Sequence, residues 1–426
     1  MTARVAGDGR APEASPAPQP IAGPPTSLYV HVPFCVSLCP YCDFVVVAGA
    51  AARGPRNRID AFVEALDREL RLRADALDAR WGAGAARPPL ETLYLGGGTP
   101  TLLPPVAIDR LLATVRDRYG LAEAAEITIE ANPGPAERGD ASHLTAAGVT
   151  RLSIGAQSFD PAELRAIGRR HHPEDVAATV TAARDARIRS ISLDLLYDIP
   201  GGTLETWASS LDAALAMEPD HLSLYALTLD DPEAEGLTGA GGDHLPTTRG
   251  ARRWRHWARQ AQDDDRAAAM YELADRRLAE AGYAWYEISN WARRGHESRH
   301  NRVYWQRKPY EAVGPGAHAF DGETRRWNAA RLDAYMAALV PGPGRQPALP
   351  PGSSEQIEPA AAGAERAILG LRTNTGIAAS EAATPPLADH LDWARAAALV
   401  ELTAADRFVL TTRGRLLSNE LFARLV

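Results

Sequence analysis

The sequence predicts an α/β fold in which parallel strands alternate with helices and curve into a partial or full βα barrel, followed by a small C-terminal domain. Between residue 27 and about residue 290, short apolar runs alternate with segments whose apolar residues recur at helical spacing. Repeated strand–helix units favour a parallel sheet with right-handed crossovers. About six units favour a barrel whose functional loops follow the carboxyl ends of the strands.

The individual elements follow from the spacing of apolar residues. Strands are predicted at 27–32, 92–95, 126–131, 151–156, 190–196, 221–227 and 284–289. Helices are predicted over 58–80 and around 108–115, with further helical stretches after the later strands. Gly148 and Gly282 stand where helices should end. Polar or glycine-rich signatures follow several strands, as one active-site face would require.

Composition excludes several classes of function. The chain has 426 residues, 45% of them hydrophobic and 23% charged, which predicts two or three globular domains. The net charge of −8 argues against binding nucleic acid by neutralising phosphates. Lys308 is the only lysine, which excludes a P-loop or a Schiff-base lysine elsewhere in the chain.

The predicted domain organisation places a barrel between two less regular segments. Residues 1–26 are rich in Ala and Pro and are expected to form a disordered tail, without the features of a signal peptide. The barrel and its extension occupy 27–340, with a surface insertion at 231–263. A linker at 341–360 leads to a mostly helical, winged-helix-like domain at 361–426. With no transmembrane segment, the expected location is the cytoplasm.

The three cysteines of the chain all fall within eight residues, as Cys35-x3-Cys39-x2-Cys42. Clustered thiols in a reducing compartment indicate metal or redox chemistry rather than structural disulfides. A zinc site would need a fourth ligand, for which His31 is the nearest candidate. An iron–sulfur cluster held by three cysteines would leave one iron open to another ligand.

This cysteine spacing after a first β-strand resembles the radical S-adenosylmethionine superfamily. The segment from His31 to Phe44 is similar to the HemN/HemW group within that superfamily, and the resemblance extends over nearly the whole chain after residue 27. Further matching segments are 96–100, 130–133, 155–159, 194–197, 286–290 and 314–318.

The resemblance implies that the three cysteines hold a [4Fe–4S] cluster whose open iron binds the amino and carboxylate groups of S-adenosylmethionine. Glu130 would accept hydrogen bonds from the ribose, and Arg169 would pair with the carboxylate of the cofactor. Glycines after the second strand would let the backbone approach the cofactor. The remaining implied cofactor residues are Tyr29, Tyr41, Gly97, Gly98, Thr99, Gln157 and Asp194.

Two positions in the sequence distinguish the two branches of the HemN/HemW group, the coproporphyrinogen oxidases and the heme chaperones. Coproporphyrinogen oxidases resemble C-x3-C-x2-C-x-C, whereas this chain has Phe44 at the last position. His300, Asn301, Tyr304 and Trp305 match the HNxxYW motif of the heme-chaperone branch. The resemblance implies that His300 is an axial ligand of heme and that Tyr304 and Trp305 cover the macrocycle, with His318 as a weaker candidate ligand.

The resemblance therefore implies a protein that carries a [4Fe–4S] cluster and S-adenosylmethionine, binds heme and delivers it to acceptor hemoproteins, membrane-bound respiratory enzymes among them, with a homodimer as a plausible state. No residue is assigned a catalytic role. The rival enzyme is an oxygen-independent coproporphyrinogen III oxidase, which decarboxylates a porphyrin precursor. A zinc-stabilised binding protein without redox chemistry is the second alternative.

Overall fold

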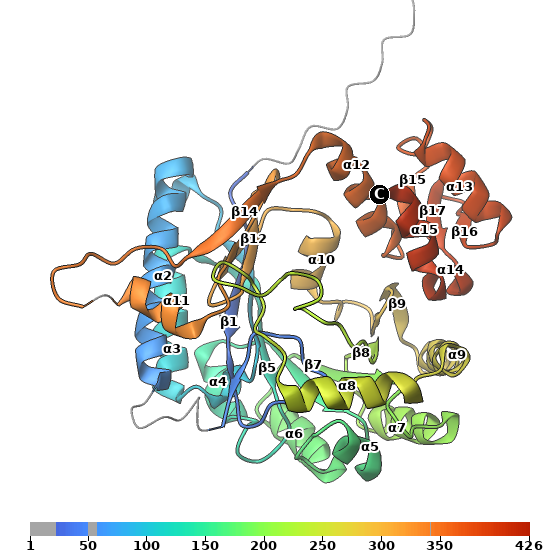
Figure 1. Cartoon of the computed structure of the whole chain (residues 1–426), viewed down its shortest axis with the longest axis horizontal. Coiled ribbons are helices and arrows are strands. Elements are labelled where there is room, and N and C mark those ends of the chain that lie inside the picture. Colours follow the sequence, from blue (N-terminus) through green and yellow to red (C-terminus); the bar gives the residue numbers. More distant parts are fainter. Residues whose placement is uncertain (1–22, 50–57, 341) are drawn as a thin grey trace, which may run out of the picture.

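The computed structural model describes residues 23–49, 58–340 and 342–426. The predicted tail therefore lies almost entirely outside the described residues. Nine strands form the main sheet, in the order β11-β1-β4-β5-β6-β7-β8-β10-β9 (Figure 1). Their bounds are β1 Ser27–Val32, β4 Leu90–Gly97, β5 Leu121–Ala131, β6 Arg151–Gln157, β7 Ser190–Tyr197, β8 His221–Ala226, β9 Ala284–Glu287, β10 Asn290–Ala292 and β11 Glu311–Val313.

The sheet is an open barrel. Strands β11, β1 and β4 to β8 are parallel neighbours, whereas β10 pairs antiparallel with both β8 and β9. Among the described residues, β11 and β9 form the two edges of the sheet. This arrangement confirms the predicted partial barrel with parallel strands.

Helices cover one face of the sheet (Figure 1). They include α2 Arg58–Trp81, α3 Pro105–Arg118, α4 Ala141–Ala147, α5 Pro161–Ala166, α6 Pro173–Asp185, α7 Leu204–Ala216, α9 Asp264–Glu280 and α11 Leu332–Leu339. Leu28, Val30 and Val32 of β1 are buried in one apolar core with Phe62 and Leu66 of α2. Alternate side chains of the strands, which point away from these helices, are largely polar and lie inside the barrel.

Two details of the sheet differ from the sequence prediction. The single strand expected at 284–289 is wrong, because the chain turns back after Glu287 and forms β9 and β10. The Glu287 carboxylate accepts hydrogen bonds from the Ser289 backbone N–H and the Asn290 side-chain amide, which stabilises this turn. The alternation of apolar residues in the sequence continues across the turn and therefore did not indicate it. Strand β11 was not predicted, since three residues are too short for a periodic signal.

The C-terminal elements form a unit with its own apolar core beside the barrel (Figure 1, red). It contains α12 Pro359–Leu371, β15 Ile377–Ala378, α13 Leu387–Ala396, β16 Val400–Leu402, β17 Arg407–Leu410, α14 Thr412–Leu416 and α15 Ser418–Leu425. An ion pair between Arg415 and Asp275, at 2.6 Å, joins this unit to α9. Arg372 likewise pairs with Glu287 of β9, at 2.7 Å.

Two segments outside the predicted strand–helix pattern contain regular structure. The expected linker at 341–360 includes β14 Gly352–Gln356, which extends a small sheet formed by β12 His318–Phe320 and β13 Thr324–Asn328. The expected surface insertion at 231–263 includes α8 Arg249–Ala261. No helix in the described part of the chain is both long and apolar enough to cross a membrane.

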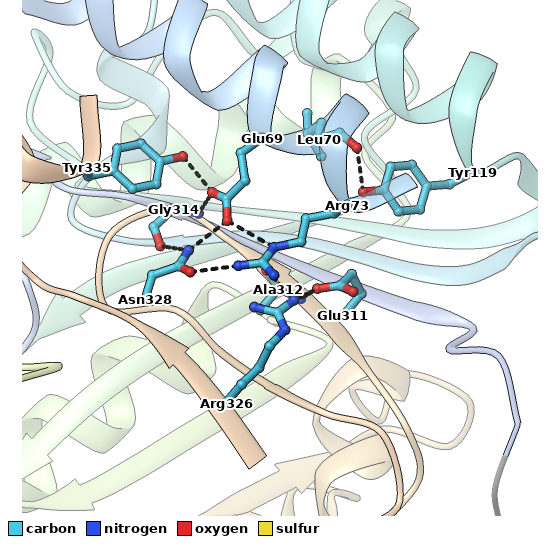
Figure 2. A network of polar contacts seen from close by, with 10 residues as sticks. All are labelled: Glu69, Leu70, Arg73, Tyr119, Glu311, Ala312, Gly314, Arg326, Asn328 and Tyr335. Carbon is cyan, nitrogen blue, oxygen red and sulfur yellow. Dashed lines mark hydrogen bonds and ion pairs between the residues drawn. The ribbon is translucent and has the colours of Figure 1, made fainter. Parts of the chain in front are cut away.

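A buried carboxylate fastens the segment after β11 to helix α2 (Figure 2). Glu69 is fully buried and accepts hydrogen bonds from the Gly314 N–H at 2.8 Å, the Asn328 amide at 2.8 Å and the Tyr335 hydroxyl at 2.7 Å. Arg73 of the next helical turn donates to both Glu69 and Asn328. Both carboxylate oxygens of Glu69 accept hydrogen bonds, and these bonds offset the free-energy cost of removing the carboxylate from water.

We predict that Glu69→Ala destabilises the protein by about 3–5 kcal/mol, because Arg73, Asn328 and Tyr335 would lose their buried partner. Glu64→Ala is the matched control, since its side chain is 44% exposed and its pair with Arg68 on the same helix should contribute about 0–1 kcal/mol. Guanidinium unfolding followed by tryptophan fluorescence measures both. Equal losses in the two variants would contradict this account of the network.

Candidate functional site

The cysteine loop begins directly after the first barrel strand. Cys35 belongs to β2 Phe34–Cys35, which pairs in parallel with β3 Val47–Ala48 and so closes the loop at its base. His31 of β1 holds the far side of the loop, because its Nε2 lies 2.7 Å from the Val45 carbonyl oxygen. All three cysteines are partly exposed and unpaired by disulfides. The loop therefore presents three thiols at the carboxyl end of the barrel strands.

The surroundings of the thiols suit a cationic ligand. Burial raises the pKa of Cys35 to about 11, although the Thr99 hydroxyl donates to its sulfur at 3.7 Å. Burial also raises the pKa of Cys42, and the neighbouring thiols add to that increase. Thiolates at these positions therefore need nearby positive charge, which the irons of a cluster would supply.

The geometry does not favour the zinc alternative. In the described part of the chain, no group of three or more His, Cys, Asp and Glu side chains is arranged to hold a single metal ion. His31, the predicted fourth zinc ligand, is buried, and its two ring nitrogens contact the Tyr29 hydroxyl and the Val45 carbonyl oxygen. In a cluster each thiolate binds a different iron, so the three sulfurs need not converge on one point.

The three glycines at the end of β4 are required by packing. A Cβ at Gly97 would lie 2.3 Å from the His31 ring, and one at Gly98 would lie 2.6 Å from the Phe34 carbonyl oxygen. Gly97 also has a φ of 105°, which favours glycine. Side chains at these positions would strike β1 and the cysteine loop, so packing within the protein alone already requires glycine there. The interpretation from the sequence, that these glycines also leave room for a cofactor, stays a prediction.

Glu130 lies at the end of β5, beside the glycines. Its carboxylate accepts hydrogen bonds from the Tyr94 hydroxyl at 2.7 Å and the Gly97 N–H at 2.9 Å. Burial raises the pKa of Glu130 to about 7, and these two hydrogen bonds only partly oppose the increase. The side chain therefore sits between its neutral and charged forms near neutral pH.

Asn132 joins Thr99 to Arg169, whose side chains contact the sulfurs of Cys35 and Cys39. Its side-chain amide donates to Thr99 at 2.9 Å and to Glu137 at 3.1 Å, and its oxygen accepts from Arg169 at 2.5 Å. Arg169 also donates to the Gly155 carbonyl at 2.7 Å and lies 3.9 Å from the Cys39 sulfur. Asn132 was missed as a site residue, although it stands in the matching segment 130–133.

The other predicted cofactor residues surround this group. Gln157 ends β6 with a φ of 65°, and a Cβ at Gly155 would lie 2.8 Å from its amide nitrogen. Asp194 accepts a hydrogen bond from Ser153 at 3.1 Å, and burial raises its pKa. Tyr41 packs beside the cysteines against Trp254 of α8, whereas Tyr29 lies deeper in the barrel. Apart from Tyr29, the structure thus brings the predicted set together at one end of the strands.

The HNxxYW segment lies toward the other end of the strands, in α10 Arg299–Trp305. The His300 ring is 1% exposed, with Nδ1 2.8 Å from the Thr92 hydroxyl and Nε2 2.8 Å from the Tyr304 hydroxyl. Thr92 and Gly97 are five residues apart on β4, which corresponds to about 17 Å along a strand. The predicted heme and cofactor residues therefore belong to separate regions.

His300 cannot coordinate iron in this conformation. The Thr92 hydroxyl donates to Ser27, so Nδ1–H of His300 donates to Thr92 and the Nε2 lone pair accepts from Tyr304. Burial lowers the pKa of His300 to about 3, which keeps the ring neutral. Iron ligation at Nε2 requires that the Tyr304 hydrogen bond break and that the ring become accessible.

The side chain of Tyr94 links the two regions. The Tyr94 ring lies 5.2 Å from the His300 ring, centroid to centroid, while its hydroxyl donates to Glu130. On the outer side of α10, Tyr304 lines a cavity of about 140 Å³. The rest of its wall is Arg307, Tyr310, Phe320, Arg325, Glu365 and Leu369.

Comparison with known proteins identifies the family. The model of the Radical SAM superfamily matches residues 29–214. A heme chaperone HemW of Mycobacterium tuberculosis is 38% identical over 425 residues, which are 98% of this chain and 99% of that protein. The chain belongs to the HemW family. The heme chaperone HemW of Escherichia coli is 37% identical over 295 residues, covering 69% of this chain and 70% of that protein.

More distant similarities agree with the fold. The mitochondrial radical S-adenosyl methionine domain-containing protein 1 of Mus musculus is 33% identical over 88% of this chain and 81% of its own. The solved structure of Escherichia coli coproporphyrinogen III oxidase (HemN) has a TM-score of 0.74 at 23% identity, over 95% of this chain and 90% of that chain. That likeness shows the fold alone.

As a HemW-family member of the radical SAM superfamily, the protein carries a [4Fe–4S] cluster and S-adenosylmethionine. The residues present fit the cluster, since three thiols of suitable spacing lie together at the strand ends. When bound, the cluster supplies an open iron for the cofactor. The chain itself holds the loop, surrounds the thiols and keeps polar side chains at the ends of β5, β6 and β7.

We predict that Glu130 makes the protein less stable as pH rises toward neutrality. In the unfolded chain its carboxyl titrates near 4.5, whereas in the folded protein burial raises the pKa to about 7. The folded state therefore keeps a proton that the unfolded state releases, so stability decreases between these values. The loss between about pH 5.5 and 8 should be roughly 2 kcal/mol.

Guanidinium unfolding of the chain without added S-adenosylmethionine, at both pH values, measures this loss. Glu130→Gln should remove it, and Glu123→Gln, at an exposed position of the same strand, should keep it. A Glu130→Gln variant with the pH dependence of the wild type would contradict the assignment.

Proposed function

We propose that this protein is a heme chaperone, which binds heme and delivers it to acceptor hemoproteins while carrying a [4Fe–4S] cluster and S-adenosylmethionine. The observation that carries the proposal is the match to a protein named heme chaperone HemW along 98% of this chain. We also place the protein in the cytoplasm, where three thiols that form no disulfide remain reduced.

We further propose that S-adenosylmethionine binds above the ends of β4 to β7. Glu130 would accept hydrogen bonds from the ribose hydroxyls, and Arg169, beside the Cys39 sulfur, would pair with the carboxylate. Gln157 and Asp194 would complete the polar wall. Support comes from the gathering of these side chains around the cysteine loop and from the buried, partly compensated carboxyl of Glu130.

For heme, we propose that His300 becomes a ligand after α10 moves. Among the described residues, Tyr304 is the one side chain that occupies its Nε2, and Tyr304 also lines the cavity beside the helix. Displacing the Tyr304 hydroxyl would connect the imidazole to that cavity. At about 140 Å³ the cavity is smaller than a heme, so α10 and α12 must separate for heme to enter.

The enzyme alternative has less support. Coproporphyrinogen III oxidase has the same fold at 23% sequence identity. A similarity at this level does not show that the two proteins catalyse the same reaction. Phe44 occupies the position of a further cysteine in the motif that coproporphyrinogen oxidases resemble, and its side chain is 61% exposed at the end of the loop. The three cysteines of the chain are all used by the motif, so none is left to replace the missing thiol.

The proposed function predicts heme transfer. Anaerobically reconstituted protein loaded with one equivalent of heme should convert an apo-hemoprotein to its holo form faster than hemin mixed with serum albumin does. The Soret band of the acceptor measures the transfer. In parallel, the same preparation with S-adenosylmethionine and reductant should not consume coproporphyrinogen III. Turnover of that substrate without heme transfer would favour the enzyme alternative.

His300 and Tyr304 predict opposite effects on heme binding. His300→Ala should shift the Soret band and weaken binding, because the proposed ligand is lost. Tyr304→Phe should strengthen binding by up to about tenfold, because no hydroxyl then occupies Nε2. Heme titration measures both, with His143→Ala, a surface histidine paired with Asp109, as control. An unchanged His300→Ala spectrum would exclude this ligand and leave His318 as the next candidate.

A further inference from the structure

We propose that Arg255 of α8 is a positioning residue for the [4Fe–4S] cluster, which fixes the cysteine loop and places a positive charge beside it. Its Nε donates to the Pro40 carbonyl at 3.1 Å, and its Nη2 donates to the Cys42 carbonyl at 2.9 Å and the Tyr41 carbonyl at 3.4 Å. Its Nη1 donates to the Asp230 carbonyl. One guanidinium thus spans three successive carbonyls of the loop that holds the cluster.

The loop needs such a donor. Between β2 and β3 the chain leaves regular structure, so its carbonyls have no strand or helix partners. One of these carbonyls belongs to Cys42, the third cysteine of the motif, so the guanidinium helps to fix the position of the Cys42 sulfur. Because Arg255 lies 213 residues after Cys42 in the chain, this contact depends on the folded barrel.

The placement of Arg255 on its helix is unusual for a charged residue. Helix α8 turns Ala251, Arg255 and Ala258 inward, where all three are buried. Trp254 on the same side packs near Tyr41 and donates its indole N–H to the Ala166 carbonyl at 2.8 Å. An apolar residue would be expected at the position of Arg255. The carbonyls of the cysteine loop explain why an arginine lies there.

Arg255 also brings charge to the cluster. Among the described residues Arg255 makes no direct ion pair, since its hydrogen-bond acceptors are all carbonyl oxygens, and the Asp43 carboxyl interacts with it only at longer range. A cluster held by three thiolates is anionic, and reduction adds negative charge. A fixed guanidinium beside the third cysteine therefore stabilises the reduced form more than the oxidised form.

Two readouts separate positioning from simple packing: the rate at which a chelator removes iron from the reconstituted protein, and the reduction potential of the cluster. Arg255→Gln should lose iron about tenfold faster, comparable to one hydrogen bond to a charged group. Its potential should fall by up to about 59 mV, a tenfold change in a one-electron equilibrium. A residue that only packs the helix would not change the potential of a cluster that is still bound.

Arg255→Lys separates the two effects. A lysine keeps the charge but cannot span the Pro40 and Cys42 carbonyls, so the potential should stay near that of the wild type while iron loss accelerates. Arg259→Gln is the matched control, because Arg259 lies one turn further along α8 and donates to the Leu229 carbonyl rather than to the loop. It should match the wild type in both readouts.

Wild-type iron loss and potential in Arg255→Gln would overturn the proposal, as would equal effects in Arg259→Gln. If Arg255→Gln does not fold, Arg255→Lys remains decisive, and wild-type iron retention in that variant would overturn the proposal. A wild-type chain that takes up no cluster would instead overturn the cofactor assignment together with this proposal. The heme assays are independent of both outcomes.

Discussion

The site depends on one constraint: a loop without regular structure must hold three thiols in fixed positions at the end of a barrel. The loop cannot do this alone, so contacts from distant parts of the chain fix it. His31 of β1 binds the Val45 carbonyl, and Arg255 of α8 donates to the carbonyls of Pro40, Tyr41 and Cys42. Glu69 contributes indirectly, because it holds Gly314, where any Cβ would lie 2.4 Å from the His31 carbonyl oxygen.

The barrel strands explain why two functional regions can share one fold. Their apolar side chains pack against the outer helices, which leaves alternate positions free for polar residues inside the barrel. The cysteine loop and Glu130 lie at one end, and His300 lies toward the other. Tyr94 contacts both, since its hydroxyl binds Glu130 and its ring packs on His300. A change in either region can therefore affect the other through Tyr94, and Tyr304 also interacts electrostatically with Glu130.

Much of this arrangement could be predicted from the sequence, because it is encoded locally. Strand periodicity gave the parallel sheet, and the spacing of Cys35, Cys39 and Cys42 gave the cluster loop. The roles of Arg255, Asn132 and Glu69 could not be predicted, since their partners lie far away in the chain and ordinary residue types carry no signal. The motif around His300 indicated a heme-related segment but not its state, because only the folded structure shows that Tyr304 occupies the imidazole.

The most direct test of the account is Mössbauer spectroscopy of the iron-57 reconstituted protein with and without S-adenosylmethionine. Three thiolates should leave one iron of the cluster distinct from the other three, and the cofactor should shift the signal of that iron alone. This result would place the cofactor at the open position above the ends of the barrel strands. Four equivalent irons that do not respond to S-adenosylmethionine would contradict the central claim that this loop holds a cluster with an open iron.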